Sequence, residues 1–406
     1  MQMAGDTLSP ITASSSASMR IEPGRLPATA DIARAYRATK ADAVEVRAWS
    51  DLERQVGKQA LEGFAGGLPA KDTVLTGVDL RGVFYLHDCD SAGGPLPWCD
   101  RARFGVWSVT KALVNEIALL RLAQKYGPEV FSAKIVDYVP AAKAYPQWAN
   151  VRFDDCINMA TGVGNGTTKR DPNDIGDGFL DPSYNDWYDA MSRDEKISAL
   201  LRTGHAYPWG PGKVARYRDQ DMFILSVAMD AYLKSKEGPN ARFWTMLERE
   251  VYEPIGIHDA PVDLTIESSG EGHPLVGFGA YPTIGDLVKI ARLYHARGTW
   301  QGRQLLYASR IDELRADTRP RGLPTGSHSP FGETTYFNAF WHLRYDATEG
   351  CKLYVPEMEG WGSNVVTLYP GGVTTIQIAH QPSDATVADD PIPMARVVNR
   401  LVPFCH

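Results

Sequence analysis

The pattern of apolar and polar positions divides the chain into strand-like segments near both ends and helical segments between them. Short β-branched and aromatic runs predict strands at residues 44–49, 73–80, 82–88, 337–346, 352–356, 364–370 and 374–380. A last helix is expected at residues 391–401. From residue 130 to about 260 the apolar positions recur at helical spacing instead. This order predicts an α/β (α+β) fold, in which both ends of the chain build one sheet domain around a helical insertion.

The same pattern predicts the domain boundaries. Residues 1–25 are rich in Ser, Ala, Thr and Pro and are expected to form a disordered extension. Residues 26–129 and 262–406 are expected to form the sheet domain, and residues 130–261 the helical domain. The polar loop at residues 164–190 is the longest, and loops of that length are usually functional or mobile.

A serine and a lysine begin one of the most apolar helices. The stretch FGVWSVTKALVNEIALLRLAQKYG, residues 104–127, predicts a helix over 109–126 that ends at Gly127. Ser108 and Lys111 are three residues apart and so share one helix face, at the end where the macrodipole is positive. A desolvated lysine there can be neutral and take the proton of the serine. The alternative is an exposed Ser and Lys on a polar face, but the apolar neighbours favour the buried pair.

Two further segments carry candidate chemistry. Tyr217 and Asp219 precede an apolar run at residues 222–233, where Asp219 can cap a helix and Tyr217 can point its phenol into a cleft. In EGWGSNVVTLYPGG, residues 359–372, two glycines flank Trp361 ahead of a strand, and an exposed edge strand there can present an N–H group to an oxyanion. Taken alone, these segments could equally be a packed tyrosine and a β-bulge.

Together and in this order, the three segments resemble the serine β-lactamase and penicillin-binding protein superfamily. They are most similar to the class C β-lactamase-related esterases and amidases, which include the family VIII carboxylesterases and 6-aminohexanoate-dimer hydrolase. The resemblance covers residues 80 to about 400, and three milder markers occur in the family's order: FDDCINMATGVG (153–164), VYEPIGI (251–257) and GFGAYPTIGDLVKIARLYHARGTWQGRQLL (277–306). It implies a β-lactamase-like fold, with an antiparallel sheet flanked by helices, a largely helical domain, and the active site in the cleft between them.

The resemblance also implies roles for individual residues. Ser108 would be the acyl-accepting nucleophile, and Lys111 and Tyr217 the general base and acid. The backbone N–H groups of Ser108 and Asn364 would form the oxyanion hole. The substrate would meet Asp219, Trp361, Gly362 and Ser363.

The chain departs from the penicillin-recognising enzymes at two of these positions. Trp361-Gly362-Ser363 stands where those enzymes have Lys-Thr-Gly, so the fixed charge that binds a substrate carboxylate is replaced by an indole. Asp219 stands where an asparagine is usual and would repel an anion. Carboxylate-bearing β-lactams and D-Ala-D-Ala peptides are therefore expected to be poor substrates.

Composition narrows the class of protein. The formal charge is −7, with 44% hydrophobic and 22% charged residues, which gives no reason to expect a nucleic-acid partner. No stretch has the length of a membrane span and no metal-ligand motif is present, so we expect no membrane span, cofactor or metal. Among five cysteines, Cys89 and Cys99 bracket a loop and are either bridged or free thiols, and Cys156 is expected to be buried. No leader is visible. The family favours a periplasmic or secreted location, although a cytoplasmic one is compatible with the sequence.

The sequence therefore predicts a serine hydrolase that cleaves a small-molecule ester or amide through an acyl-enzyme at Ser108. Two alternatives use the same site: an amide or peptide hydrolase, and an acyltransferase. A third is a non-catalytic, penicillin-binding-like sensing protein, which the unusual residues at 219 and 363 motivate. The sequence gives no oligomeric state.

Overall fold

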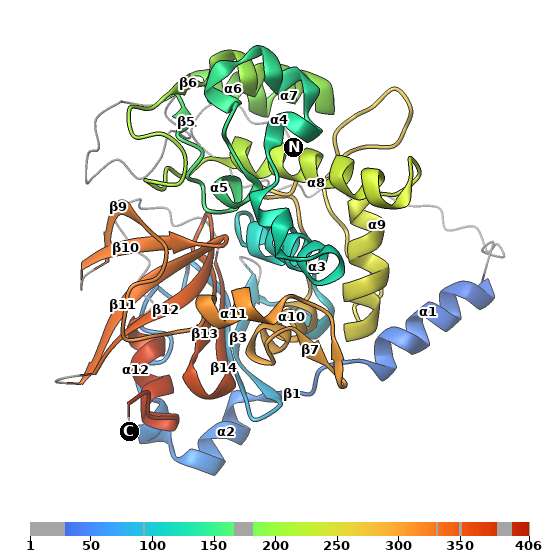
Figure 1. The fold of residues 1–406 in the computed structure, drawn as a ribbon. Helices are drawn as coiled ribbons and strands as arrows, with labels where there is room; N and C mark the ends of the chain where they lie inside the picture. The colour runs from blue at the N-terminus through green and yellow to red at the C-terminus, as the bar shows by residue number, and fades with distance from the viewer. Residues whose placement is uncertain are drawn as a thin grey trace.

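The computed structural model describes residues 29–91, 94–165, 182–329, 332–348, 351–379 and 392–405. The predicted disordered extension, residues 1–25, and most of the predicted loop at 164–190 lie outside the described residues. Figure 1 shows a sheet in the lower half of the view, helices in front of it and below it, and a further group of helices above.

A ten-stranded sheet is assembled from both ends of the chain. Its order is β1-β3-β2-β14-β13-β12-β11-β10-β9, with β4 paired to β3. Neighbouring strands are antiparallel, except that β1 and β3 are parallel. The predicted mixed architecture is therefore confirmed. The strands are β1 (Val46–Ala48), β2 (Thr73–Leu80), β3 (Val83–Ser91), β4 (Gly94–Pro95), β9 (Leu323–Ser329), β10 (Gly332–Phe337), β11 (Phe340–Thr348), β12 (Cys351–Gly360), β13 (Asn364–Tyr369) and β14 (Val373–Ala379).

Helices cover both faces of this sheet. On one face, α2 (Trp49–Val56) and α12 (Ile392–Leu401) contribute Leu52 and Val398 to a buried cluster with Val78 of β2. On the other face, α3 (Ile117–Tyr126) and α10 (Ile284–His295) join a larger apolar cluster with β14. Every residue of β2 is buried, because both faces of that strand are covered. Fully burying each such aliphatic side chain stabilises the fold by roughly 1.5–3 kcal/mol.

The described residues between 130 and 261 are largely helical. They form α4 (Ile135–Tyr138), α5 (Phe153–Ile157), α6 (Pro182–Tyr188), α7 (Arg193–Thr203), α8 (Asp219–Glu237) and α9 (Phe243–Leu247), with one small strand pair, β5 (Val163–Gly164) and β6 (His205–Ala206). The other elements are α1 (Thr29–Ala41), α11 (Ala308–Leu314), β7 (Thr299–Trp300) and β8 (Arg303–Gln304). No helix among the described ranges combines the length and the apolar character that a membrane crossing requires.

The structure corrects the bounds of two predicted strands and adds one helix. The strand predicted at 337–346 is β11 from residue 340 onward, and its first residues form a hairpin turn in which Asn338 and Ala339 adopt left-handed backbone angles between β10 and β11. No glycine or proline marks that turn. The predicted strand at 44–49 ends at Ala48, and Trp49 begins a helix. Helix α1 was not predicted.

Two disulfides and one thiol account for the cysteines. Cys89 and Cys99 are bridged, which decides between the two alternatives that the spacing allowed. Cys351 and Cys405 form a second bridge that the sequence analysis did not predict. Cys156 is a buried free thiol, as expected. Disulfides are typical of proteins from oxidising compartments.

Candidate active site

Ser108 and Lys111 lie where a loop becomes a buried helix. The backbone of Trp107 is left-handed, with φ 50°, and the N–H of Lys111 donates to the carbonyl of Ser108 at 3.0 Å to close the first turn. Residues Lys111–Glu116 are π-helical and continue into α3. The helix predicted over 109–126 is therefore confirmed, with a wider first part. Such π-helical insertions occur often at functional sites.

The side chain of Lys111 contacts three groups in the interior. Its Nζ donates to Ser108 Oγ at 2.5 Å and to the carbonyl of Gly277 at 2.7 Å. It also lies 2.6 Å from Asp219 Oδ1, and only 1% of the lysine side chain is exposed. The structure therefore brings the serine and the lysine together on one face, as their spacing predicted.

The protonation state of Lys111 follows from these contacts. Burial would lower its pKa, but the Asp219 carboxylate and Tyr217 outweigh burial and leave the pKa raised. Lys111 is therefore an ammonium ion at neutral pH. The sequence interpretation allowed a neutral amine, which the buried carboxylate disfavours.

Tyr217 stands over the lysine, as expected. Its ring centroid is 4.8 Å from Lys111 Nζ, and the ring stacks on Trp341 and meets Tyr336 edge-on. Burial raises the pKa of Tyr217, while hydrogen bonding to Lys111 and Ser108 opposes part of that rise. Tyr217 is accordingly a neutral phenol at neutral pH, and it can donate or relay a proton beside Ser108.

Asp219 has a different position from the one expected. It is the first residue of α8, and no side chain caps that helix, so the predicted capping role is wrong. Its carboxylate is buried, accepts a hydrogen bond from the Tyr184 hydroxyl at 2.8 Å and pairs with Lys111. Asp219 therefore faces the lysine, and its charge is compensated there.

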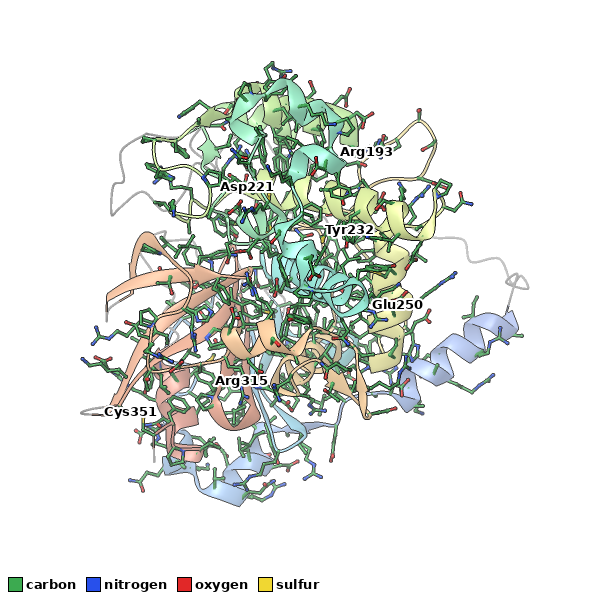
Figure 2. All side chains as sticks on the ribbon, in the orientation of Figure 1. Arg193, Asp221, Tyr232, Glu250, Arg315 and Cys351 are labelled. Atoms are coloured by element: carbon green, nitrogen blue, oxygen red, sulfur yellow. A yellow bond between two sulfur atoms is a disulfide. The ribbon has the colours of Figure 1, made fainter. Side chains whose placement is uncertain are left out.

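A second buried ion pair lies at the same start of α8, between Arg218, just before the helix, and Asp221. Arg218 Nη1 is 2.8 Å from Asp221 Oδ1, and both side chains are almost completely buried. Arg218 also donates to the carbonyl of Val163, and Thr161 donates to Asp221 Oδ2 at 2.9 Å. Asp221 is labelled in Figure 2. This pair fastens the segment around β5 to the start of α8 and so fixes the backbone that carries Tyr217 and Asp219.

The turn between β12 and β13 approaches the serine through Gly360. A Cβ atom added to Gly360 would lie 2.1 Å from the Val106 carbonyl oxygen and 3.2 Å from the backbone nitrogen of Ser108. Asn364 pairs with Gly360 across the hairpin, in the next strand. Both strands are interior strands, so the predicted exposed edge strand is wrong. The close approach requires a glycine, since any side chain would collide with the Val106 carbonyl oxygen.

Aromatic rings lie together beside the turn between β12 and β13. Trp107 and Trp361 meet edge-on with centroids 5.1 Å apart, and Phe278 lies near Trp107 and Tyr188. Trp361 is 50% exposed. The two tryptophans border a hollow of about 240 Å³ that Gly362 and Asn364 also line. Ser363 lies in the same turn with a left-handed backbone, φ 67°.

Several contacts could not be inferred from the sequence. Gly277 belongs to the glycine-rich GFGAYP run, which marked the segment without indicating a bond to Lys111. Tyr184 gave no signal beyond being aromatic, because its bond to Asp219 joins residues 35 positions apart. Within the described ranges, no three His, Cys, Asp or Glu side chains are grouped closely enough to hold a metal ion.

Sequence comparison finds no matching family model and no matching curated protein. Solved structures do match. A penicillin-binding protein homologue from Caulobacter crescentus has a TM-score of 0.56 at 15% identity, covering 93% of this chain and 98% of that one. A penicillin-binding protein from Bacillus halodurans has a TM-score of 0.54 at 16% identity, covering 81% and 95%. A β-lactamase/D-alanine carboxypeptidase from Pseudomonas syringae has a TM-score of 0.53 at 10% identity, covering 92% and 99%.

These neighbours share one architecture, a mixed sheet flanked by helices, and each aligns over most of its own length. TM-scores of 0.53–0.56 over most of each chain establish the fold. Sequence identities of only 10–16% leave the substrate open. The protein has the fold shared by the penicillin-binding proteins and the serine β-lactamases.

Proposed function

We propose that the protein is a serine hydrolase that cleaves a carboxylic ester or amide through an acyl-enzyme on Ser108. The observation that carries this proposal is the 2.5 Å contact between Ser108 Oγ and the buried Lys111 Nζ. A buried lysine that donates to a half-buried serine is costly unless the pair has a use, and an activated nucleophile would be that use. Tyr217, beside both groups, would deliver the proton to the leaving group.

The oxyanion would be stabilised by two backbone N–H groups. Ser108 supplies the first, as the sequence pattern proposed. For the second, the close approach of Gly360 to the Ser108 backbone favours the N–H of Trp361, which follows Gly360, over that of Asn364 in the neighbouring strand. Donors fixed in this way typically contribute about 3–4 kcal/mol to transition-state stabilisation.

The hollow bordered by Trp361 and by Trp107, which is next to Ser108 in the sequence, favours a neutral, apolar or aromatic acyl group. Trp107, Trp361 and Phe278 provide apolar contact around the hollow. Arg103 also lines this hollow, but Asp259 binds it at 2.8 Å, so its charge is already compensated. An ester of such an acid is therefore the preferred substrate class, with the matched amide as the slower one.

A fluorophosphonate probe tests the proposal directly. The native protein should be labelled on Ser108, and heat-denatured protein should not, because the reactivity depends on the assembled site. Peptide mapping by mass spectrometry identifies the labelled residue, and Ser108→Ala is the matched control. No label on a folded protein, or equal label in the Ser108→Ala variant, would refute the assignment. Initial rates on an aromatic ester and its matched amide then rank the two substrate classes.

A further inference from the structure

The buried carboxylate of Asp219 adds a group that the Ser-Lys-Tyr arrangement does not account for. Only 4% of its side chain is exposed, and its two oxygens face Lys111 Nζ at 2.6 Å and the Tyr184 hydroxyl at 2.8 Å. An uncharged amide could meet the same two groups without the cost of burying a charge, with its oxygen toward Lys111 and its NH2 group donating to the tyrosine oxygen. The carboxylate must therefore be judged by its charge and by its capacity to hold a proton.

We propose that the base which activates Ser108 is the Lys111–Asp219 pair, in which Asp219 is the positioning residue that orients Lys111 and takes up the proton. This inference rests on the proposed function, since it describes how the same serine is activated. It concerns the residue that differs from the usual asparagine of the resembled enzymes.

Among the titratable groups that surround Asp219, its carboxylate is the group that can accept the proton of Ser108. Lys111, whose pKa is raised, starts as an ammonium ion and has no lone pair to accept a proton. The remaining titratable groups that act on Asp219 are phenols with raised pKa values, and they are therefore neutral: Tyr184 and Tyr188 on α6, Tyr217 before α8, and Tyr336 on β10. Of these groups only the carboxylate can gain a proton when Ser108 loses one.

The activation of Ser108 moves one proton from its hydroxyl group to Asp219 by way of Lys111. The Oγ–H bond of Ser108 breaks as Oγ bonds to the substrate carbonyl carbon. Lys111 first passes one proton to Asp219 across 2.6 Å, which frees a lone pair on Nζ, and the amine then accepts the Ser108 proton across the 2.5 Å contact. Lys111 remains an ammonium ion, Asp219 becomes neutral, and the negative charge moves to the oxyanion. When the intermediate collapses, the proton returns through Lys111 and Tyr217 to the leaving group, and Asp219 is ionised again.

The pH dependence of Ser108 labelling by a fluorophosphonate tests this inference. In that reaction Oγ bonds to phosphorus and fluoride leaves without a proton, so only the base is probed. In the native protein the labelling rate should fall at acid pH, as the carboxylate that accepts the proton becomes protonated. Asp219→Asn removes the charge that raises the pKa of Lys111 and leaves the burial that lowers it, so the neutral amine becomes the base. The acid limb should move to higher pH by at least about one unit, with the rate recovering under alkaline conditions.

Two further variants separate this role from a structural one. Asp219→Glu keeps a carboxylate, so its acid limb should stay at the native position even if the maximal rate falls. Asp221→Asn changes a carboxylate on the same helix that pairs with Arg218 instead of Lys111, so it should lower the melting temperature without moving the limb.

The outcomes are distinct. A limb that is unmoved in Asp219→Asn, with labelling slowed equally at every pH, would show a structural role and overturn the inference. If Asp219→Asn does not fold by circular dichroism, a displaced limb in Asp219→Glu would overturn it instead. Absence of labelling of the native protein at every pH would refute the proposed function itself, and the inference with it.

Discussion

Two ion pairs at the start of α8 are similarly buried, but their cations contact different further groups. Lys111–Asp219 and Arg218–Asp221 are both buried, and each carboxylate also accepts a hydroxyl hydrogen bond, from Tyr184 in the first pair and from Thr161 in the second. The difference is what the cation touches. Lys111 reaches a half-buried serine, whereas Arg218 reaches the carbonyl of Val163.

This difference indicates which buried charge serves chemistry. A guanidinium cannot lose its proton in a protein and binds through a fixed set of donors, so it suits a structural fastening. An ammonium ion can exchange protons when a suitable acceptor lies beside it. Burial and charge alone therefore do not identify a catalytic pair. The exchangeable proton and the adjacent nucleophile do.

The largest expected effect on stability comes from breaking the structural pair. Arg218→Met leaves Asp221 buried without its cation, which should lower the free energy of unfolding by about 3–5 kcal/mol. Because Arg218 binds Asp221 and the Val163 carbonyl rather than the Ser108–Lys111 pair, the labelling rate per folded molecule should stay within about tenfold of native and keep its pH limb. Urea unfolding and labelling of the folded fraction measure the two effects. A displaced limb would mean that the pairs are not separable.

In contrast to Asp219 and Asp221, Glu116 is a buried carboxyl group whose Oε2 has no hydrogen-bond partner within the described residues. Burial raises its pKa to about 8. The unfolded chain ionises this group near its ordinary pKa of about 4.5, while the folded protein keeps the proton, so stability falls as the pH rises between those values.

Through Glu116 the native protein should lose about 3 kcal/mol of unfolding free energy between pH 5 and pH 8. Glu116→Gln removes this loss, because the amide does not titrate. Urea unfolding of both proteins at the two pH values gives the difference. Identical pH dependence in native protein and variant would show that Glu116 is already ionised in the fold.

The sequence predicted most of the sheet and the core of the site because both depend on short-range patterns. The run at 73–80 is rich in β-branched residues, and the structure has β2 at those residues. Ser108 and Lys111 are related by helix geometry alone, so their meeting needs no knowledge of the rest of the fold.

The remaining features depend on contacts between distant segments. The position of Asp219 in the sequence was compatible with a helix cap, and only the packing of α8 against the helix that carries Lys111 turns its carboxylate toward that lysine. Gly360 was recognised as a site of close approach, but the approaching group, the Ser108 backbone, lies some 250 residues away. The Cys351–Cys405 bridge likewise follows from the position of the segment after α12.

The smallest expected effects come from the two hydroxyl groups that donate to the carboxylates. Tyr184→Phe and Thr161→Val each remove one hydrogen bond to an ionised group, which should cost about 1.5–3 kcal/mol of stability in either case. Their effects on chemistry should differ. Without Tyr184 the ionised form of Asp219 loses a donor, so the acid limb of Ser108 labelling should move to higher pH, whereas Thr161→Val should leave it in place. Equal melting temperatures with only one displaced limb would separate the reactive pair from the structural one, and two unmoved limbs would show that Tyr184 only packs against the site.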